Sequence, residues 1–377
     1  MINIYLDNAA TTEIDPEAIK VISFFQQLNT GNASSLHKRG VAAAKEIERA
    51  RQIIAAKINA SFKDLFFTSG GTESNNFAIK GIAFANREKG RHLITSKIEH
   101  PSVIATMEWL ETQGFIVTYL PVDKEGFINP ADVEKAINKK TILVSIMHAN
   151  SEIGTIEPIQ EIGMICKKRD IYFHTDACQS FTKVELNVKK QNVDIATLNA
   201  HKIHGPKGIG AIYIRKGVKI EPLLHGGGQE NNLRSGTYNT GGIVGFGKAV
   251  EISNIHDSKR MSELRDYFIH NIQNVVDDVI LNGAKKERLC NNINLIFKNV
   301  NGKKIFKKLN ERSIFISTGS ACSSAKLTPS HVLIAIGIKS QIAHEAVRIS
   351  LSKWTTKEEL DIVIQNIKKI IGEERNA

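Results

Sequence analysis

Residues 159–180 read IQEIGMICKKRDIYFHTDACQS, and this stretch contains the structural unit that predicts the fold. Residues 159–168 have the amphipathic pattern of a helix, and the apolar run 171–173 that follows has the character of a buried strand. Polar side chains come directly after that run, among them Asp176 and Gln179. A helix, a strand and then chemically capable residues is the repeating order of an α/β sheet with a site at its edge.

The same alternation extends over much of the chain. Further strands are predicted at 65–67, 93–95, 116–119, 142–147, 195–198 and 210–214, and further helices at 75–85 and 102–112. Strands that alternate with helices predict a largely parallel sheet with helices on both faces. Because such sheets bind ligands beyond the carboxyl ends of their strands, the residues after each strand are candidates for a site.

Five of these strand ends deliver side chains capable of chemistry. If the strands are neighbours, the side chains converge on one crevice. They are Thr72, His100, Asn150, Asp176 with Gln179, and His201 with Lys202.

Lys202 is the candidate with the most specific chemistry. It follows a predicted buried strand, so we expect desolvation to lower its pKa and to suit it to Schiff-base formation; a lysine that reaches solvent is the alternative. Asp176 stands at another strand end, and the Gly70-Gly71-Thr72 turn precedes a helix that Thr72 could cap and whose N-terminus could bind an anion. A lysine, an acidic partner for a pyridinium nitrogen and a phosphate cup are what pyridoxal phosphate needs.

Composition narrows the class of protein. The chain has 377 residues, 42% hydrophobic and 24% charged, which is typical of a globular protein of about two domains. No apolar run approaches the ~18–20 residues of a membrane span, and the N-terminus lacks the basic region of a signal peptide. The net charge of +11 comes from scattered lysines and arginines. We therefore expect a cytoplasmic protein that contacts neither a membrane nor, directly, nucleic acid.

The four cysteines are Cys166, Cys178, Cys290 and Cys322. None stands in a C-x-x-C pair, so we predict no metal site and no structural disulfide. Histidines 174, 201 and 204 could be taken for zinc ligands, but no carboxylate stands in that cluster as a further ligand. Cys322 lies in STGSACSSAK at 317–326, among small residues typical of a mobile loop. A packing cysteine and a nucleophile on a loop remain as interpretations.

Nine stretches, in order along nearly the whole chain, resemble the cysteine desulfurases. This NifS/IscS-like group lies in the class V aminotransferase branch of the fold type I pyridoxal phosphate enzymes. Each stretch alone is weak evidence for the resemblance, whereas the whole set in this order is specific to the family. The stretches are YLDNAATT (5–12), FTSGGTESNN (67–76), EHPSV (99–103), SIMHANSEIG (145–154), HTDACQS (174–180), AHKIHGPKGIGAIYIR (200–215), HGGGQE (225–230), RSGT (234–237) and STGSACSSA (317–325).

The resemblance implies a role for each candidate residue. Lys202 would bind pyridoxal 5'-phosphate as a Schiff base and shuttle a proton, Asp176 would keep the ring nitrogen protonated, and His100 would stack on the ring and take part in acid–base steps. The substrate carboxylate would be bound by Asn150 and Arg348. Other cofactor contacts would come from Gly71, Thr72, Asn150, Gln179, Asn199, His201 and Thr237, the last from the second subunit of a homodimer.

The resemblance also implies the reaction. L-cysteine would give L-alanine and a persulfide on the nucleophile Cys322, and the sulfur would pass to an acceptor protein. That acceptor could be an iron–sulfur scaffold, a small carrier or an enzyme that thiolates tRNA or DNA. Selenocysteine lyase or another class V enzyme is the alternative function. Asn199 departs from the family, in which serine is common at this position.

Two domains follow from the same resemblance. A large domain that binds pyridoxal phosphate would span residues 14–250. A smaller α+β domain would span residues 251–377 and be joined by the N-terminal segment 1–13.

Overall fold

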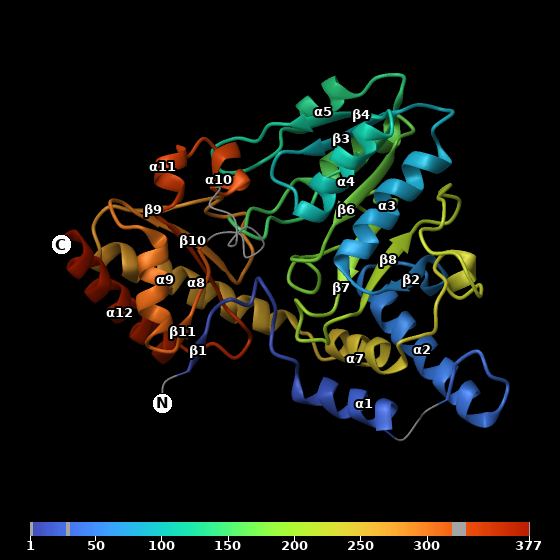
Figure 1. Cartoon of the computed structure of the whole chain (residues 1–377), viewed down its shortest axis with the longest axis horizontal. Coiled ribbons are helices and arrows are strands. Elements are labelled where there is room, and N and C mark those ends of the chain that lie inside the picture. The colour runs from blue at the N-terminus through green and yellow to red at the C-terminus, as the bar shows by residue number, and fades with distance from the viewer. Residues whose placement is uncertain (1–2, 28–30, 319–328, 377) are drawn as a thin grey trace.

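The computed structural model describes residues 3–27, 31–318 and 329–376. Its centre is a seven-stranded sheet of order β2-β8-β7-β6-β5-β3-β4 (Figure 1). β8 runs antiparallel to β2 and β7, and the other neighbouring pairs are parallel. The strands are β2 (Leu65–Thr68), β3 (His92–Ser96), β4 (Ile116–Leu120), β5 (Thr141–Ser145), β6 (Tyr172–Asp176), β7 (Ile195–Asn199) and β8 (Gly210–Ile214).

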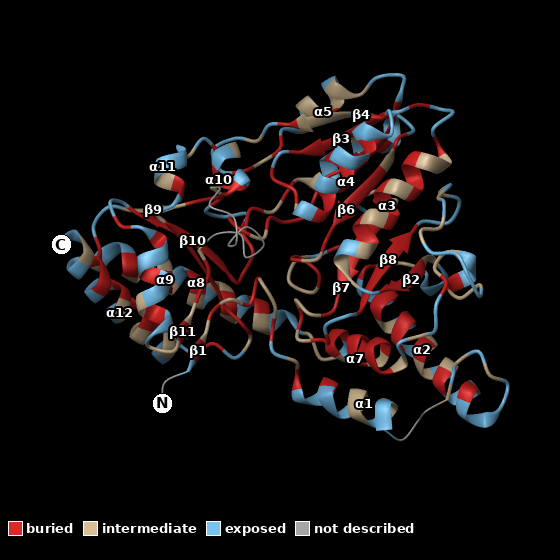
Figure 2. Cartoon of the chain, viewed as in Figure 1, coloured by how far each residue is buried: buried red, intermediate tan, exposed pale blue. Residues whose placement is uncertain are grey.

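Helices cover both faces of this sheet. Consecutive residues of a strand point to opposite faces, so one strand contributes side chains to a core on each side. Phe66 packs in a core with α3 and α4, whereas Phe67 packs in a second core with α2, α6 and α7. Figure 2 shows the strands buried between helices whose outer surfaces are exposed. The predicted mostly parallel α/β sheet is confirmed. The helices of this region are α1 (Pro16–Gln27), α2 (Lys38–Lys57), α3 (Gly71–Ala85), α4 (Pro101–Thr112), α5 (Pro130–Ala136), α6 (Ile159–Lys168) and α7 (Thr240–Glu251), with the 3-10 turns η1 (Phe62–Asp64) and η2 (Glu230–Asn232).

The C-terminal part forms a three-stranded antiparallel sheet of order β12-β10-β9 with its own core. The N-terminus belongs to this core, since β1 pairs with β11 and both Ile4 and Leu6 are buried in it. The elements are β1 (Ile4–Tyr5), α8 (Ile255–Val275), β9 (Val279–Leu281), β10 (Asn292–Phe297), α9 (Gly302–Asn310), β11 (Ile314–Phe315), α10 (His331–Ala335), α11 (Ser340–Ala343), β12 (Ala346–Ser350) and α12 (Lys357–Arg375).

The division into two domains at residue 250 stays a prediction. Packing is consistent with a boundary nearby, since α7 packs on α1 and α2 while α8 packs on α12 and β10. A smaller apolar cluster joins the two regions where Met147 and Ile153 meet Ile296 and Leu333. In the described part of the chain, no helix is both long and apolar enough to cross a membrane.

Candidate active site

A cavity of about 300 Å³ opens where the carboxyl ends of the central strands meet the start of α3 and strand β12. Its size is at the lower end of the range for small-molecule sites, about 300–1,000 Å³. Most of the predicted site residues line it, so strand ends far apart in sequence do converge. These residues are Gly71, Thr72, His100, Asp176, Gln179, Asn199, His201, Lys202 and Arg348.

Lys202 lies just past β7, with its amine held by the N-terminal segment. Nζ donates to the backbone oxygens of Ala9 at 2.5 Å and Ala10 at 2.6 Å. Burial and, to a smaller extent, the positive charge of Arg348 lower the pKa of Lys202 to about 8. A lysine near this pKa has an appreciable neutral fraction at physiological pH, as a nucleophilic amine requires.

Asp176 and His100 are joined by two intervening side chains. Asn75 donates through Nδ2 to Asp176 Oδ2 at 2.7 Å and to Ser102 Oγ at 2.9 Å. Ser102 in turn contacts Nδ1 of His100 with its hydroxyl at 2.8 Å and donates to it from its backbone N–H at 3.1 Å. Because Nδ1 accepts from a backbone N–H, the hydrogen of the neutral ring lies on Nε2. Burial lowers the pKa of His100, which favours this neutral form.

The start of α3 forms one wall of the cavity. Its N-cap is Gly70, at φ 152°, with no side-chain hydrogen bond to the cap. The expectation that Thr72 caps this helix is therefore wrong, since Thr72 is its second residue and is exposed. A Cβ on Gly71 would lie 2.6 Å from Sγ of Cys178, so the backbone and the thiol touch because residue 71 is glycine. Unpaired N–H groups at such a helix start favour an anion.

His201 and Asn199 lie close to that wall. Burial and the charge of Lys202 lower the pKa of His201 to about 4, so its ring is neutral at physiological pH. Its Nδ1 lies 3.2 Å from Oγ1 of Thr11. Asn199 is buried, and its Oδ1 has no hydrogen-bond partner among the described residues. A lysine amine, a buried carboxylate, an anion-binding helix start and an unpaired amide oxygen in one cavity fit pyridoxal phosphate.

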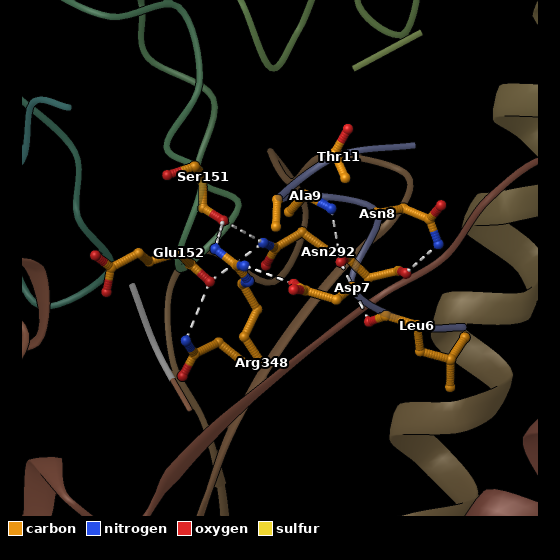
Figure 3. Close-up of polar contacts among 12 residues, drawn as sticks. Leu6, Asp7, Asn8, Ala9, Thr11, Ser151, Glu152, Asn292 and Arg348 are labelled. Carbon is orange, nitrogen blue, oxygen red and sulfur yellow. Dashed lines mark hydrogen bonds and ion pairs between the residues drawn. The ribbon is translucent and has the colours of Figure 1, made fainter. Parts of the chain in front are cut away.

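Gln179 and Arg348 complete the described cavity from opposite parts of the sequence. Gln179 donates from Nε2 to the backbone oxygen of Ala9 at 3.0 Å. Arg348, on β12, is held by an ion pair with Asp7 and a hydrogen bond to the backbone oxygen of Ser151 (Figure 3). The cavity therefore has a planar cation on the wall formed by the C-terminal region, suited to a carboxylate.

Asn150 is not brought to the cavity, contrary to its predicted contacts with cofactor and substrate. Its amide is used within its own turn: Nδ2 donates to the backbone oxygen of Ile98 at 2.8 Å, and Oδ1 accepts from the backbone N–H groups of Glu152 and Ile153. The neighbouring Ser151 lines the cavity instead. The sequence could not separate these two adjacent polar residues, because both stand just after the same strand.

Two further predicted residues are not among the described residues of the cavity. Thr237 is exposed, in the loop that follows η2, and is not among the described residues that line the cavity. Cys322 lies outside the described residues. Within the described ranges, no three His, Cys, Asp or Glu side chains are placed to hold a metal ion. His174 is instead buried between the hydroxyls of Ser145 and Thr197.

Sequence reasoning missed several residues of the site. Ala9 and Ala10 contribute backbone oxygens, which a side-chain pattern cannot reveal. Glu99 also lines the cavity, and burial raises its pKa to about 8. The signal that could have found the first two was the motif at 5–12, for which the resemblance implied no role.

Comparison with known proteins places this arrangement in a family. A cysteine desulfurase IscS of Dictyoglomus turgidum is 51% identical over 371 residues, covering 98% of this chain and 94% of the relative. The IscS of Methanosarcina thermophila is 49% identical, covering 99% of this chain and 93% of the relative. A solved NifS-like protein superposes with a TM-score of 0.93 at 38% identity, covering 99% of this chain and all of the other.

A second solved structure, SspA in complex with cysteine, gives a TM-score of 0.85 at 40% identity and covers 94% of this chain and all of the other. The aminotransferase class-V family model matches residues 4–363. That match spans both the central sheet and β12, and so all of the described cavity. The chain therefore belongs to the aminotransferase class-V family.

Proposed function

We propose that this protein is a pyridoxal phosphate-dependent cysteine desulfurase, which converts L-cysteine to L-alanine and retains the sulfur as a persulfide on Cys322. The observation that supports this most directly is the meeting of Lys202, Asp176 and the start of α3 in one cavity that Arg348 also lines. Relatives about half identical over nearly the whole chain are named cysteine desulfurases.

The residues of the cavity would hold pyridoxal phosphate through complementary chemistry. Lys202 would bind its aldehyde carbon, and Asp176, fixed by Asn75, would accept a hydrogen bond from the protonated ring nitrogen and so keep it protonated. Thr72, His201 and the N–H groups of Gly71 and Thr72 would bind the phosphate, with Gln179, Asn199 and the His100 ring around the pyridine. When bound, the cofactor supplies an electron sink for the charge that develops on the substrate α-carbon.

The protein residues then divide the proton and sulfur chemistry between them. Arg348 would bind the carboxylate of L-cysteine and so fix the position of the α-carbon. Lys202 would remove or add a proton at that carbon, since its amine is mostly neutral at a pH above its pKa of about 8. His100 would act in the acid–base steps by giving the Nε2 proton to a reacting group of the substrate and by accepting a proton at the same nitrogen.

Cys322 would supply the nucleophile for sulfur removal. Its thiolate attacks the sulfur of the substrate, an S–S bond forms, and the substrate C–S bond breaks with its electron pair left on carbon. Carbon then takes up a proton, so that one L-cysteine and one thiol give one L-alanine and one persulfide. The terminal sulfur is later transferred to a thiol or other nucleophile of an acceptor protein.

A homodimer is part of the proposal. Phe24 on α1, Leu36 on the segment before α2 and Val41 on α2 are exposed apolar side chains, and Leu36 is 97% exposed. Exposed apolar side chains of this size would be covered in a subunit interface. Thr237, away from its own cavity, would reach the phosphate site of the partner. Light scattering should give a dimer, and Leu36→Asp should weaken it. A monomer at micromolar concentration would contradict this part.

The experiment that tests the function compares substrates in parallel. The purified protein should take up pyridoxal phosphate, become yellow and form alanine from L-cysteine, and Cys322→Ala should abolish that activity. Full activity of Cys322→Ala would overturn the role of the thiol. Activity on selenocysteine that survives this substitution, with none on L-cysteine, would favour a selenocysteine lyase. Protein that stays colourless with added cofactor would overturn the proposal as a whole.

The acceptor and the compartment belong to the proposal as well. The three cysteines of the described chain are free thiols, which suits a reducing cytoplasm. A labelled persulfide should pass to an acceptor protein: a scaffold, a small carrier or a thiolation enzyme. Loading the protein with labelled cysteine in an extract identifies the acceptor by the protein that becomes labelled.

A further inference from the structure

The guanidinium of Arg348 is held by a carboxylate that does not belong to the cavity wall. Nη2 of Arg348 lies 2.8 Å from Oδ1 of Asp7, and Nη1 donates to the backbone oxygen of Ser151 at 3.3 Å (Figure 3). Arg348 and Ser151 line the cavity, whereas Asp7 is not among the described residues that do. Asp7 therefore contacts the guanidinium without occupying the space in which a ligand would bind.

Asp7 is fixed relative to the strand that bears Arg348. It forms an isolated parallel bridge with Ser350, two residues from Arg348 on β12. Asn8 donates to the backbone oxygen of Ser350 at 2.9 Å, and the N–H of Ala9 donates to the Ser350 hydroxyl at 2.8 Å. The carboxylate and the guanidinium thus stand on one rigid frame.

The second acceptor, the oxygen of Ser151, is fixed as well. Asn292 donates from Nδ2 to the backbone oxygens of Ser151 and Glu152, at 3.2 Å each (Figure 3). Asn294, which pairs with Arg348 across the sheet, donates to the oxygen of Glu152 at 3.1 Å. The guanidinium of Arg348 therefore contacts two acceptors, the Asp7 carboxylate and the Ser151 backbone oxygen, and further hydrogen bonds hold both of them in place.

These two contacts leave other hydrogens of the guanidinium available to bind a ligand. One hydrogen on each Nη is used, and Nε is buried with no acceptor among the described residues. An arginine side chain has several rotatable bonds and loses entropy when it is held in one orientation. An ion pair that fixes this orientation before a ligand arrives lowers the entropy cost of binding that ligand.

We propose that Asp7 is a positioning residue, which holds Arg348 in the orientation that binds the carboxylate of the amino-acid substrate. This proposal rests on the proposed function, in which Arg348 binds that carboxylate. Loss of an ion pair that only stabilises the fold would change the affinity for every ligand equally. A positioning residue affects ligands with a carboxylate and spares those without one.

The test uses the holoenzyme with Asp7→Asn, one pair of ligands that differ in the carboxylate, and the substrate L-cysteine. L-alanine and ethylamine, which lacks the carboxylate, are titrated by the change in cofactor absorbance, and KM is measured for L-cysteine. A hydrogen bond to a charged group contributes about 1.5–3 kcal/mol, so the Kd of L-alanine and the KM of L-cysteine should rise about tenfold or more. The Kd of ethylamine, the affinity for pyridoxal phosphate and kcat should change less than about twofold on the same reasoning.

Asp15→Asn is the matched control. Asp15 lies in the same N-terminal region and its carboxylate pairs with Lys353 instead of Arg348, so all these quantities should stay at their wild-type values. Asp7→Glu keeps the charge on a longer side chain and should recover part of the lost affinity. If Asp7→Asn does not fold, Asp7→Glu serves as the test, because displacement of the carboxylate should weaken L-alanine and spare ethylamine.

Equal effects of Asp7→Asn on L-alanine and ethylamine, or no effect on L-alanine, would overturn the proposal. Arg348→Ala separates this failure from failure of the proposed function. If Arg348→Ala weakens L-alanine selectively and Asp7→Asn does not, the positioning role alone is wrong. If Arg348→Ala does not discriminate the ligands, the carboxylate site itself is misassigned and the role of Asp7 falls with it.

Discussion

The amine of Lys202 should take up pyridoxal phosphate with a pH dependence far from that of an ordinary lysine. Its ordinary pKa is 10.5, and burial together with Arg348 lowers it to about 8. At pH 7 the neutral fraction is then about one in ten, roughly 300-fold more than for a free lysine. The contacts agree with this, because a neutral amine has two hydrogens and Lys202 has two backbone acceptors, Ala9 and Ala10.

The assay follows the rate at which cofactor-free protein gains the absorbance of the bound cofactor, from pH 6 to pH 10.5. The neutral amine is the nucleophile, so the rate should rise with pH and level off above about pH 8. Arg348→Gln removes a positive charge that disfavours the ammonium form, so the midpoint should lie higher in this variant. A wild-type rate that still climbs steeply above pH 9.5 would refute the reasoning, as would an unchanged midpoint in Arg348→Gln.

Two further substitutions test the packing around the site. Gly71→Ala should weaken cofactor binding about tenfold by equilibrium dialysis, because its Cβ would lie 2.6 Å from Sγ of Cys178; Cys178→Ala in the same chain should restore binding, and failure to do so would place the cause elsewhere. Glu230→Gln should lower stability by about 3 kcal/mol and Tm by about 6–12 °C, since it breaks the buried bidentate pair with Arg51 at 2.7 Å. The exposed pair of Lys20 and Glu17 is the control, and Glu17→Gln should shift Tm by less than about 2 °C.

The α/β class could be predicted because the central strands are buried on both faces. Apolar runs such as Leu93-Ile94 supply one residue to each core, and such runs are visible without any structure. The exact ends of the helices and strands were harder to predict from the sequence. β6 extends to Asp176 itself, and α3 begins at Gly71, four residues before the predicted start, because a glycine N-cap gives no side-chain signal.

The site could be predicted where chemistry depends on a side chain at a strand end. Lys202, Asp176 and His100 were predicted in this way, and all three line the cavity. The pairing of Arg348 with Asp7 could not be found, because a salt bridge between residues 341 positions apart depends on how β12 meets the N-terminal segment. Asn150 was misassigned for a related reason: whether residue 150 or residue 151 faces the cavity is decided by the turn, which polarity does not specify.

A single-turnover experiment measures directly whether sulfur passes from L-cysteine to Cys322. Protein loaded with pyridoxal phosphate and free of acceptor is mixed with one equivalent of L-cysteine, and alanine and the modified peptide are measured together. The proposed desulfurase reaction should give one alanine for each protein chain and one additional sulfur on the peptide that contains Cys322, with neither product in Lys202→Ala. Alanine formed in equal amount without sulfur on Cys322, or both products formed by Lys202→Ala, would contradict it.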